Sequence, residues 1–304
     1  MPNKEPSVLE FRHLRAFMTI AENLHFARSA ELLGLSPPTL TAQIQELERL
    51  LQVRLFHRTK RSVALTPAGE AFLVEARASM VQLERAVDVG RRAGRGQVGK
   101  VMIGYVGSAV FFGVLQDQVQ RFRARWPDVM VDTREFATDQ LIALIEEGGV
   151  DVGFVRTPVV LPASMSSHAL ARDGFCVALP ADHPLARADQ PIRPSALAKE
   201  SFVAPEQGLG LEEVGRRGRF IPHVVSIPGT LVAVLTQVAL GVGVAVVPGI
   251  LTGVIRLPNV VFRAISGPAI TSEVEALFRR HERLPTVRNL IEQIVGTETA
   301  SFEG

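Results

Sequence analysis

The segment that most constrains the fold is "GLSPPTLTAQIQELERLL", residues 34–51. Gly34 suits the positive φ at the end of a helix. Ser36 is a favoured N-cap, and Pro37 is tolerated at the first helical position because its missing N–H has no helical partner there. The segment therefore predicts that one helix ends and the next begins within three residues of sequence, at a tight turn.

The helix predicted to follow Ser36 has one apolar side and one polar side. Its apolar residues fall at steps of four, three and four: Leu40, Ile44, Leu47 and Leu51. Polar residues lie on or beside the opposite face: Thr39, Thr41, Gln43 and Gln45. Helical spacing also predicts helices over 11–23 and 26–33. Together the segments predict a helix-turn-helix, the arrangement that places a second helix in a DNA groove.

A basic segment follows these helices. Residues 53–66 predict two short strands joined by a turn at 59–62, which is a β-wing. From Arg49 to Gly69 the chain contains no acid but these basic residues: Arg49, Arg54, Arg58, Lys60 and Arg61. Helical spacing alone fits a structural helix bundle as well as a DNA-binding unit, and charge alone fits a solvated face. The combination of helices and basic wing favours double-stranded DNA as the partner.

The net charge of +2 hides an asymmetry between the two parts of the chain. Residues 1–100 hold 15 Lys and Arg against 10 Asp and Glu, whereas residues 101–304 hold 18 against 21. The N-terminal part is therefore the part expected to meet a polyanion.

A long helix is predicted from Pro67 to Arg92, with Thr66 as its N-cap. It carries one apolar stripe: Phe72, Ala76, Met80, Leu83 and Val87. A single long helix does not bury such a stripe, so we expect it to pair with the same helix of a second copy, as in a coiled coil. Packing on its own chain is the alternative. The Gly- and Arg-rich residues 91–100 predict a linker.

Beyond this linker, strand and helix patterns alternate. Strands are predicted at 100–108, 129–136, 150–156, 174–180, 201–205, 244–248, 260–266 and 272–280, and helices at 110–127, 139–149, 230–240 and 287–296. Alternation of this kind predicts an α/β fold with mostly parallel sheets covered by helices. A break at 157–171 suggests two lobes with a ligand cleft between them.

Several classes of protein are not supported by the sequence. The single Cys176 excludes an internal disulfide and fits a small buried side chain in a reducing compartment. The sequence shows no Cys/His cluster that would predict a metal site and no phosphate loop that would predict a nucleotide cofactor. It also shows no nucleophilic set of side chains that would predict an enzyme. The N-terminus lacks a signal-peptide core, so we expect a cytoplasmic protein. Residues 221–255 lack charge, but Pro and Gly divide them into pieces of globular length, so no membrane segment is expected.

The order of these features resembles a LysR-type transcriptional regulator over nearly the whole chain. The resemblance lies in "LRAFMTIAENLHFARSAELLGLSPPTLTAQIQELERLLQVRLFHRT", "VALTPAGEAFL", "VDVGF", "ADHPLA" and "GVGVAVVP". Residues 98–115 and 138–156, with "ADHPLA", further resemble the branch that responds to muconate and other acids of aromatic catabolism.

The resemblance implies a winged helix-turn-helix domain in residues 1–66, a linker and dimerisation helix in 67–96, and a periplasmic-binding-protein-like effector domain in 97–304. Lobe I would comprise 97–170 and 267–304, and lobe II 171–266. It implies a homodimer, commonly assembled into a homotetramer. A small carboxylated or aromatic co-inducer between the lobes would change the pose of the DNA-binding heads on a promoter.

The resemblance also carries DNA-contact roles onto matching positions. Residues at the start of the second helix would enter the major groove: Ser36, Pro38, Thr39, Thr41 and Gln43. Residues of the wing would bind phosphates or reach the minor groove: Arg58, Lys60 and Arg61. Pro37 stands where the family often has Gln, and Ala42 where it often has Arg. Sequence preference should therefore depend more on Thr39, Gln43 and DNA shape.

Effector contacts are expected where strands lead into helices. Ser108 and Thr138 each follow a strand and precede a predicted helix, where free N–H groups and a hydroxyl can hold an anion. Both residues would equally serve as ordinary N-caps. Arg156 would pair with an effector carboxylate or form a salt bridge at the rim. Lobe II is expected to contribute Pro205, Gln207 and Thr230.

A second hypothesis is a small-molecule carrier or enzyme on the same two-lobed fold, with the N-terminal part serving only dimerisation. A carrier of this kind would normally show a signal peptide, and an enzyme would show a catalytic set in its cleft. The sequence shows neither pattern.

Overall fold

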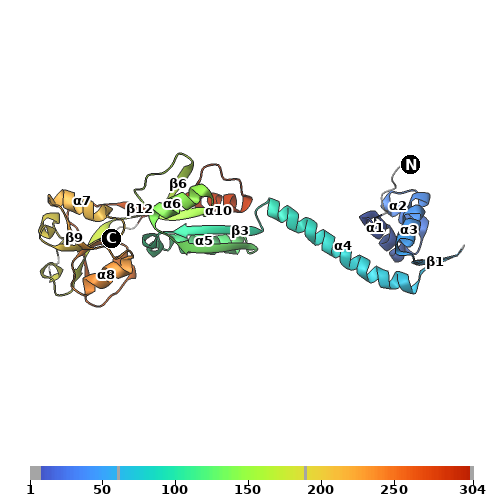
Figure 1. The fold of residues 1–304 in the computed structure, drawn as a ribbon, viewed down its shortest axis with the longest axis horizontal. Coiled ribbons are helices and arrows are strands. Elements are labelled where there is room, and N and C mark those ends of the chain that lie inside the picture. The colour runs from blue at the N-terminus through green and yellow to red at the C-terminus, as the bar shows by residue number, and fades with distance from the viewer. Residues whose placement is uncertain (1–7, 60–61, 188–189, 302–304) are drawn as a thin grey trace. The chain divides into compact units, whose positions relative to one another are not determined.

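A computed structural model describes residues 8–59, 62–187 and 190–301 of the chain (Figure 1). The chain forms two compact units, Met1–Arg91 and Arg92–Gly304.

The first unit contains three helices and a two-stranded wing. The elements are α1 (Phe11–Asn23), α2 (Phe26–Leu33), α3 (Pro37–Leu51), β1 (Phe56–Arg58) and β2 (Val63–Leu65). The predicted turn is confirmed, because Gly34 ends α2 with a φ of 65° and the Ser36 hydroxyl accepts a 3.3 Å hydrogen bond from the Thr39 N–H. The predicted wing turn includes Lys60 and Arg61, which lie outside the described residues.

Aromatic packing fixes the wing and the start of the next helix to the three-helix core. The ring of Phe17 lies 5.3 Å from that of Phe56 and 5.0 Å from that of Phe72. The predicted apolar side of α3 is buried in the same cluster: Leu40, Ile44 and Leu47. The opposite side of α3 is thereby left facing solvent.

Helix α4 (Pro67–Gly94) is the long helix that the sequence predicts. The Thr66 hydroxyl accepts a hydrogen bond of 2.9 Å from the Gly69 N–H and caps it. Ala76 is buried in the core of the first unit, whereas Leu83 and Val87 are 41% and 45% exposed. Packing on its own chain therefore accounts for the first part of the apolar stripe and leaves the second part uncovered among the described residues.

One lobe of the second unit is built on a six-stranded sheet with the order β13-β6-β12-β5-β3-β4. The strands are β3 (Gly99–Tyr105), β4 (Val129–Glu135), β5 (Val152–Arg156), β6 (Met165–Asp173), β12 (Ser272–Arg279) and β13 (Ala300–Ser301). Strand β3 is parallel to β4 and β5, but β12 is antiparallel to β5 and to β6. The expectation of mostly parallel sheets therefore fails at β12, the strand that returns from the other lobe after β6 leads into it, whereas β13 is parallel to β6.

Helices cover both faces of this sheet: α5 (Val114–Arg125), α6 (Thr138–Glu147) and α10 (Pro285–Val295). A β-carbon on Gly104 of β3 would lie 2.2 Å from the Leu141 side chain of α6, so glycine is required there. Gly99 lies an odd number of residues before Gly104 on β3, so the two glycines face opposite sides of the sheet. Thr286 of α10 contacts Gly99, so α10 covers the side opposite to α6. The carboxyl ends of β3, β4 and β5 are left free for a site.

The other lobe is built on an antiparallel three-stranded sheet. Strand β7 (Phe175–Pro180) lies between β10 (Ala245–Pro248) and β11 (Val260–Ala264), again contrary to the expectation of parallel pairing. A parallel pair and further helices complete the lobe: β8 (Ser201–Val203), β9 (His223–Ser226), α7 (Leu209–Gly218), α8 (Leu231–Ala239) and α9 (Leu251–Val254). The sequence does not predict α7 or β9. Short 3₁₀ turns occur at η2 (Pro184–Arg187) and η3 (Pro194–Leu197).

The uncharged stretch 221–255 folds within this lobe. Its longest helix, α8, has 9 residues and buries four apolar side chains: Leu231, Val234, Leu235 and Val238. Among the described residues, no helix has the length and apolar character needed to cross a membrane.

Candidate effector cavity and DNA interface

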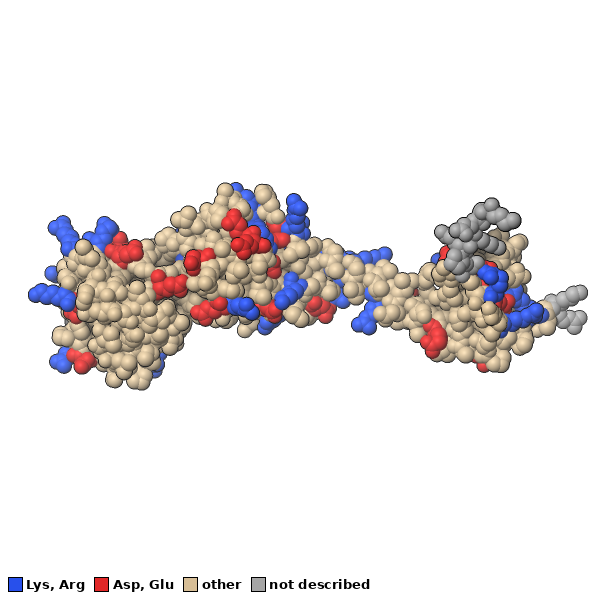
Figure 2. Space-filling model, in the orientation of Figure 1, with Lys and Arg blue, Asp and Glu red and all other residues tan. Residues whose placement is uncertain are grey.

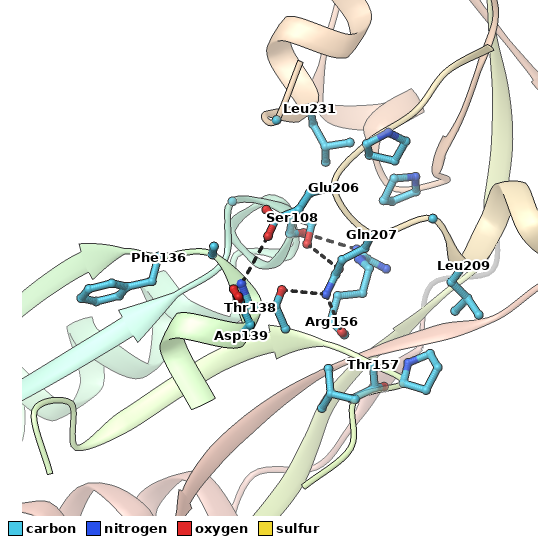
Figure 3. Close-up of a pocket in the computed structure, with 18 of the residues that line it drawn as sticks. Ser108, Phe136, Thr138, Asp139, Arg156, Thr157, Glu206, Gln207, Leu209 and Leu231 are labelled. Atoms are coloured by element: carbon cyan, nitrogen blue, oxygen red, sulfur yellow. Dashed lines mark hydrogen bonds between the residues drawn. The ribbon is translucent and has the colours of Figure 1, made fainter. Parts of the chain in front are cut away.

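A cavity of about 910 Å³ lies between the two lobes of the second unit (Figure 3). One lobe contributes residues at the ends of β3, β4 and β5, and the other contributes residues 205–209, Glu212 and residues 229–231. The predicted effector residues all line this one cavity: Ser108, Thr138, Arg156, Pro205, Gln207 and Thr230. The structure thus brings together residues up to 122 positions apart in the sequence. Their contact with an effector stays a prediction.

Ser108 lies in a 3₁₀ turn and not at the start of a long helix. The prediction of a helix from Val110 is wrong, because η1 (Gly107–Phe112) ends at Gly113, whose φ is 75°, and α5 begins only at Val114. The hydroxyl of Ser108 donates a hydrogen bond of 3.4 Å to the side-chain carbonyl of Gln207, which comes from the other lobe.

Thr138 is the first residue of α6, and the N-cap is Ala137. The ordinary N-cap role considered for Thr138 is therefore wrong. Its hydroxyl instead accepts a 3.1 Å hydrogen bond from Gln207 Nε2, which also donates to the carbonyl oxygen of Arg156 at 3.1 Å. The Thr138 N–H donates to Glu206 Oε1 at 3.4 Å, so a carboxylate already occupies the N-terminus of α6 (Figure 3).

Thr230 and Pro205 form parts of the wall from the second lobe. The Thr230 hydroxyl accepts a hydrogen bond of 3.2 Å from the Ala233 N–H, so Thr230 caps α8. Pro205 follows β8 and begins the segment that carries Glu206 and Gln207 into the cavity.

Arg156 is buried in the cavity wall, with only 4% of its surface exposed. Its guanidinium donates to Ser272 Oγ at 2.6 Å and lies 3.9 Å from Asp173 Oδ2. Burial lowers the pKa of Arg156 to about 10 although the Asp173 carboxylate opposes this shift. The rim salt bridge is therefore the wrong description, since the ion pair is buried. Among the described residues, Arg156 Nε has no hydrogen-bond partner.

Asp173 is the buried partner of Arg156 and was not predicted from the sequence. It is 3% exposed, ends β6, and accepts a hydrogen bond of 3.1 Å from the Ile250 N–H. Burial raises the pKa of Asp173 despite that hydrogen bond and the nearby Arg156. Arg156 ends β5, Asp173 ends β6 and Ser272 begins β12, next to the two segments where the chain crosses from one lobe to the other. The ion pair therefore lies between these crossing segments and the cavity wall.

Cys176 is not a reactive group. Burial raises the pKa of its thiol to about 12, so the thiol stays protonated at neutral pH. Within the described part of the chain, no group of three or more His, Cys, Asp or Glu side chains is placed to hold a metal ion.

Four acidic residues of the cavity were not predicted from the sequence: Glu135, Asp139, Glu206 and Glu212. Glu206 lies between the predicted residues Pro205 and Gln207, and this adjacency was the available signal. The other three lie at the ends of β4, α6 and α7, which the sequence did not place around a common space.

In the first unit, the exposed side of α3 is a line of residues at steps of four, three and four: Pro38, Ala42, Gln45 and Arg49. Of the predicted DNA contacts, Thr39 is exposed beside this line, whereas Thr41 and Gln43 are half-buried on its flanks. The Thr41 hydroxyl donates to the Pro37 carbonyl at 2.9 Å. Gln45 and Arg49 are therefore the exposed polar residues that the predicted set omits, and their 3.6-residue period was the signal.

Arg58 joins the wing to α3. Its guanidinium lies 3.1 Å from Glu48 Oε2 and 4.6 Å from the centre of the Phe26 ring. The other Glu48 oxygen accepts hydrogen bonds from the backbone of Leu55 and Phe56. In Figure 2, Lys and Arg side chains lie on the visible face of this unit near the wing. Lys60 and Arg61 lie outside the described residues.

Comparison with known families identifies both parts of the chain. Residues 11–70 match the "Bacterial regulatory helix-turn-helix protein, lysR family", and residues 94–297 match the "LysR substrate binding domain".

Two curated relatives from Escherichia coli (strain K12) match along almost their whole length. The uncharacterized HTH-type transcriptional regulator YnfL is 35% identical over 92% of this chain and 96% of its own. The Hca operon transcriptional activator HcaR is 33% identical over 93% of this chain and 96% of its own. The match to both relatives includes the first unit and the second.

A solved structure has a similar fold. Full-length CbnR in complex with its target DNA superposes with a TM-score of 0.78 at 25% identity, covering 94% of this chain and 98% of that one.

Proposed function

Because the chain belongs to the LysR family of transcriptional regulators, we propose that it binds promoter DNA through α3 and the wing and responds to a small carboxylated or aromatic metabolite in the cavity. At the level of the family, the chain is a DNA-binding transcriptional regulator with an effector-binding domain. Its relatives are regulators and not enzymes.

The single observation that carries the effector part of the proposal is the Glu206 carboxylate at the N-terminus of α6. The Thr138 N–H donates to this carboxylate, which supports this helix terminus as a place for a carboxylate oxygen. An effector carboxylate would take the position of Glu206 there. The Nε of Arg156, which has no hydrogen-bond partner in the described part of the chain, and the Ser108 hydroxyl are further donors in the same wall.

Gln207 links the two lobes across the cavity. Its side chain comes from one lobe and forms hydrogen bonds with Ser108, Thr138 and Arg156 of the other. A ligand that replaces these bonds would favour one lobe arrangement over another by its difference in affinity for the two. The lobe arrangement would in turn set the pose of the DNA-binding heads on the promoter, in the cytoplasm.

For DNA we propose that the residues of the α3 N-terminal turn approach the major groove: Ser36, Pro38, Thr39, Thr41 and Gln43. The wing residues Arg58, Lys60 and Arg61 would contact phosphates. The exposed apolar stripe of α4 would pair with that of a second copy, giving a homodimer or homotetramer.

Two measurements test the proposed function. The first is a nuclease footprint on DNA flanking the protein's own gene, where we expect protection at moderate salt. Absence of protection would contradict the DNA-binding role of α3. The second is a thermal-shift screen of aromatic and dicarboxylic acids with the full-length protein. Ser108→Ala and Thr138→Ala should each weaken the response to a hit, and a hit that neither substitution changes would contradict the cavity assignment.

A further inference from the structure

The charged groups of the cavity are mostly acidic. Its lining contains four carboxylates and one guanidinium: Glu135, Asp139, Glu206, Glu212 and Arg156. The guanidinium is already paired with the buried Asp173. A cleft lined by charge of one sign concentrates the field of that sign inside it. A ligand with only negative charge would therefore meet repulsion in this cavity.

Three of the four carboxylates are placed against the cavity wall. Glu206 Oε1 accepts the hydrogen bond of the Thr138 N–H at 3.4 Å. Glu135 Oε1 lies 2.6 Å from the position that a β-carbon on Gly107 would occupy. Glu212 Oε1 lies 3.2 Å from the position that a β-carbon on Gly208 would occupy. Gly107 and Gly208 both line the cavity, so these carboxylates lie at its surface from both lobes.

These carboxylates differ from several other acids in the same unit. Asp151 is paired with Arg279 at 3.0 Å, and Glu213 lies within 2.7 Å of both Arg216 and Arg217. Among the residues that the structure describes, none of the four cavity carboxylates has an ion-pair partner within 4.0 Å. The described residues thus supply no basic side chain that pairs with these carboxylates.

The remaining wall suits a ligand with an apolar body and one oxygen-bearing end. Ile142, Phe175 and Leu209 supply apolar surface, and the Nε of Arg156 is a buried donor without a described partner. A buried N–H normally donates a hydrogen bond, so the Arg156 Nε–H favours a ligand oxygen as its acceptor.

We infer that the effector carries a cationic nitrogen group as well as a carboxylate, and is a zwitterion of the α-amino-acid class. The inference rests on the proposed function, which supplies the carboxylate. That carboxylate takes the place of Glu206 at the N-terminus of α6, and the ammonium group is held by Glu206 together with Glu212 or Glu135. Each of these contacts is a charge-assisted hydrogen bond.

The test compares ligands that differ in one charged group. Full-length protein is titrated in thermal-shift and calorimetric experiments with the common protein amino acids, and each hit is compared with its deaminated acid and its decarboxylated amine. For leucine these are isocaproate and isopentylamine, and for phenylalanine hydrocinnamate and phenethylamine. We expect an amino acid to bind at least about tenfold more tightly than either relative, the loss expected for one charge-assisted hydrogen bond.

Substitutions in the cavity supply a second readout. Glu206→Gln, and at least one of Glu212→Gln and Glu135→Gln, should weaken binding of the amino acid about tenfold but leave binding of the deaminated acid unchanged or tighter. Glu147→Gln is the matched control, because Glu147 is exposed on α6 and does not line the cavity. A folding defect would weaken both ligands, so the opposite responses distinguish ligand contact from structural damage.

Other outcomes overturn one claim or both. A deaminated acid that binds as tightly as its amino acid, or a simple acid from the first screen that binds when no amino acid does, overturns the zwitterion and leaves the proposed carboxylate effector. An amine that binds as tightly as its amino acid overturns the carboxylate part of both claims. Absence of binding by any amino acid, acid or amine overturns both.

Discussion

Arg156 and Asp173 face each other beside the crossings between the two lobes, with Nη1 and Oδ2 3.9 Å apart and side-chain exposures of 4% and 3%. Arg156 lines the cavity, whereas Asp173 holds the Ile250 N–H of the other lobe. A buried ion pair contributes little net stability, because desolvation offsets the attraction. The position of the pair indicates that it fixes the geometry of the segments where the chain crosses between the lobes.

Asp173 should give the protein a pH-dependent stability. Burial raises its pKa above 3.8, so the folded state binds the proton more tightly than the unfolded state. Stability from this group is therefore present at low pH and is lost as the pH rises from about 4 towards the raised value, at up to about 1.4 kcal/mol per pH unit.

Urea unfolding of the wild type and Asp173→Asn, followed by the fluorescence of the single Trp126, measures this effect. We expect the free energy of unfolding of the wild type to fall relative to that of the variant across this range, since Asn does not ionise. Asp132→Asn is the control, because Asp132 is 43% exposed in its pair with Lys100. Parallel pH profiles for wild type and Asp173→Asn would contradict the account.

Ser36→Ala should destabilise the start of α3. The Ser36 hydroxyl accepts the Thr39 N–H, and loss of such a cap costs about 1 kcal/mol. Hydrogen exchange in the first turn of α3 should become about fivefold faster, as that free energy implies. Ser36→Thr retains the acceptor and should restore most of the protection. If Ala and Thr variants exchange alike, the cap has no role in stability.

Arg58 should contribute one phosphate contact and also hold the wing. Removing one phosphate contact reduces the slope of log binding constant against log salt by about 0.9. Arg58→Ala should show that reduction, whereas Arg58→Lys keeps the charge and should keep the slope while losing most of the contact with Glu48. A slope that Arg58→Ala leaves unchanged would refute the phosphate role.

The exposed stripe of α4 should be the place of self-association. Leu83→Glu places a charge within the stripe and should shift the protein to smaller species in analytical ultracentrifugation, because burying an unpaired carboxylate is unfavourable. Val81→Glu introduces the same group at a residue that is 65% exposed and lies off the stripe, so it should leave the assembly unchanged. Equal effects of the two substitutions would argue against the stripe as the interface.

Local signals in the sequence were sufficient for most elements. Gly34, Ser36 and Pro37 act within one turn of chain, so the break between α2 and α3 was predictable. Strand β6 was not, because "MSSHALARD" lacks a long apolar run and acquires its partners from distant β12. Likewise, the positive φ of Gly113 separates η1 from α5 where the apolar pattern continues through it.

The cavity was predictable only in part. Ser108 and Thr138 were found because strand ends in such folds gather at one edge. Asp173 and Glu206 were not, since their roles arise from residues far along the chain. Arg156 and Ser272, for example, are 116 positions apart in sequence and 2.6 Å apart in the structure.

The most direct test of the account is whether a ligand in the cavity changes the contact with DNA. Nuclease footprints on the flanking DNA are recorded for wild type and Thr138→Val with increasing amounts of a ligand from the screens. We expect the ligand to alter the extent of protection by the wild type, and Thr138→Val to need about tenfold more ligand while binding DNA normally without it. Identical footprints with and without saturating ligand would contradict the central claim that the cavity controls how the protein binds its promoter.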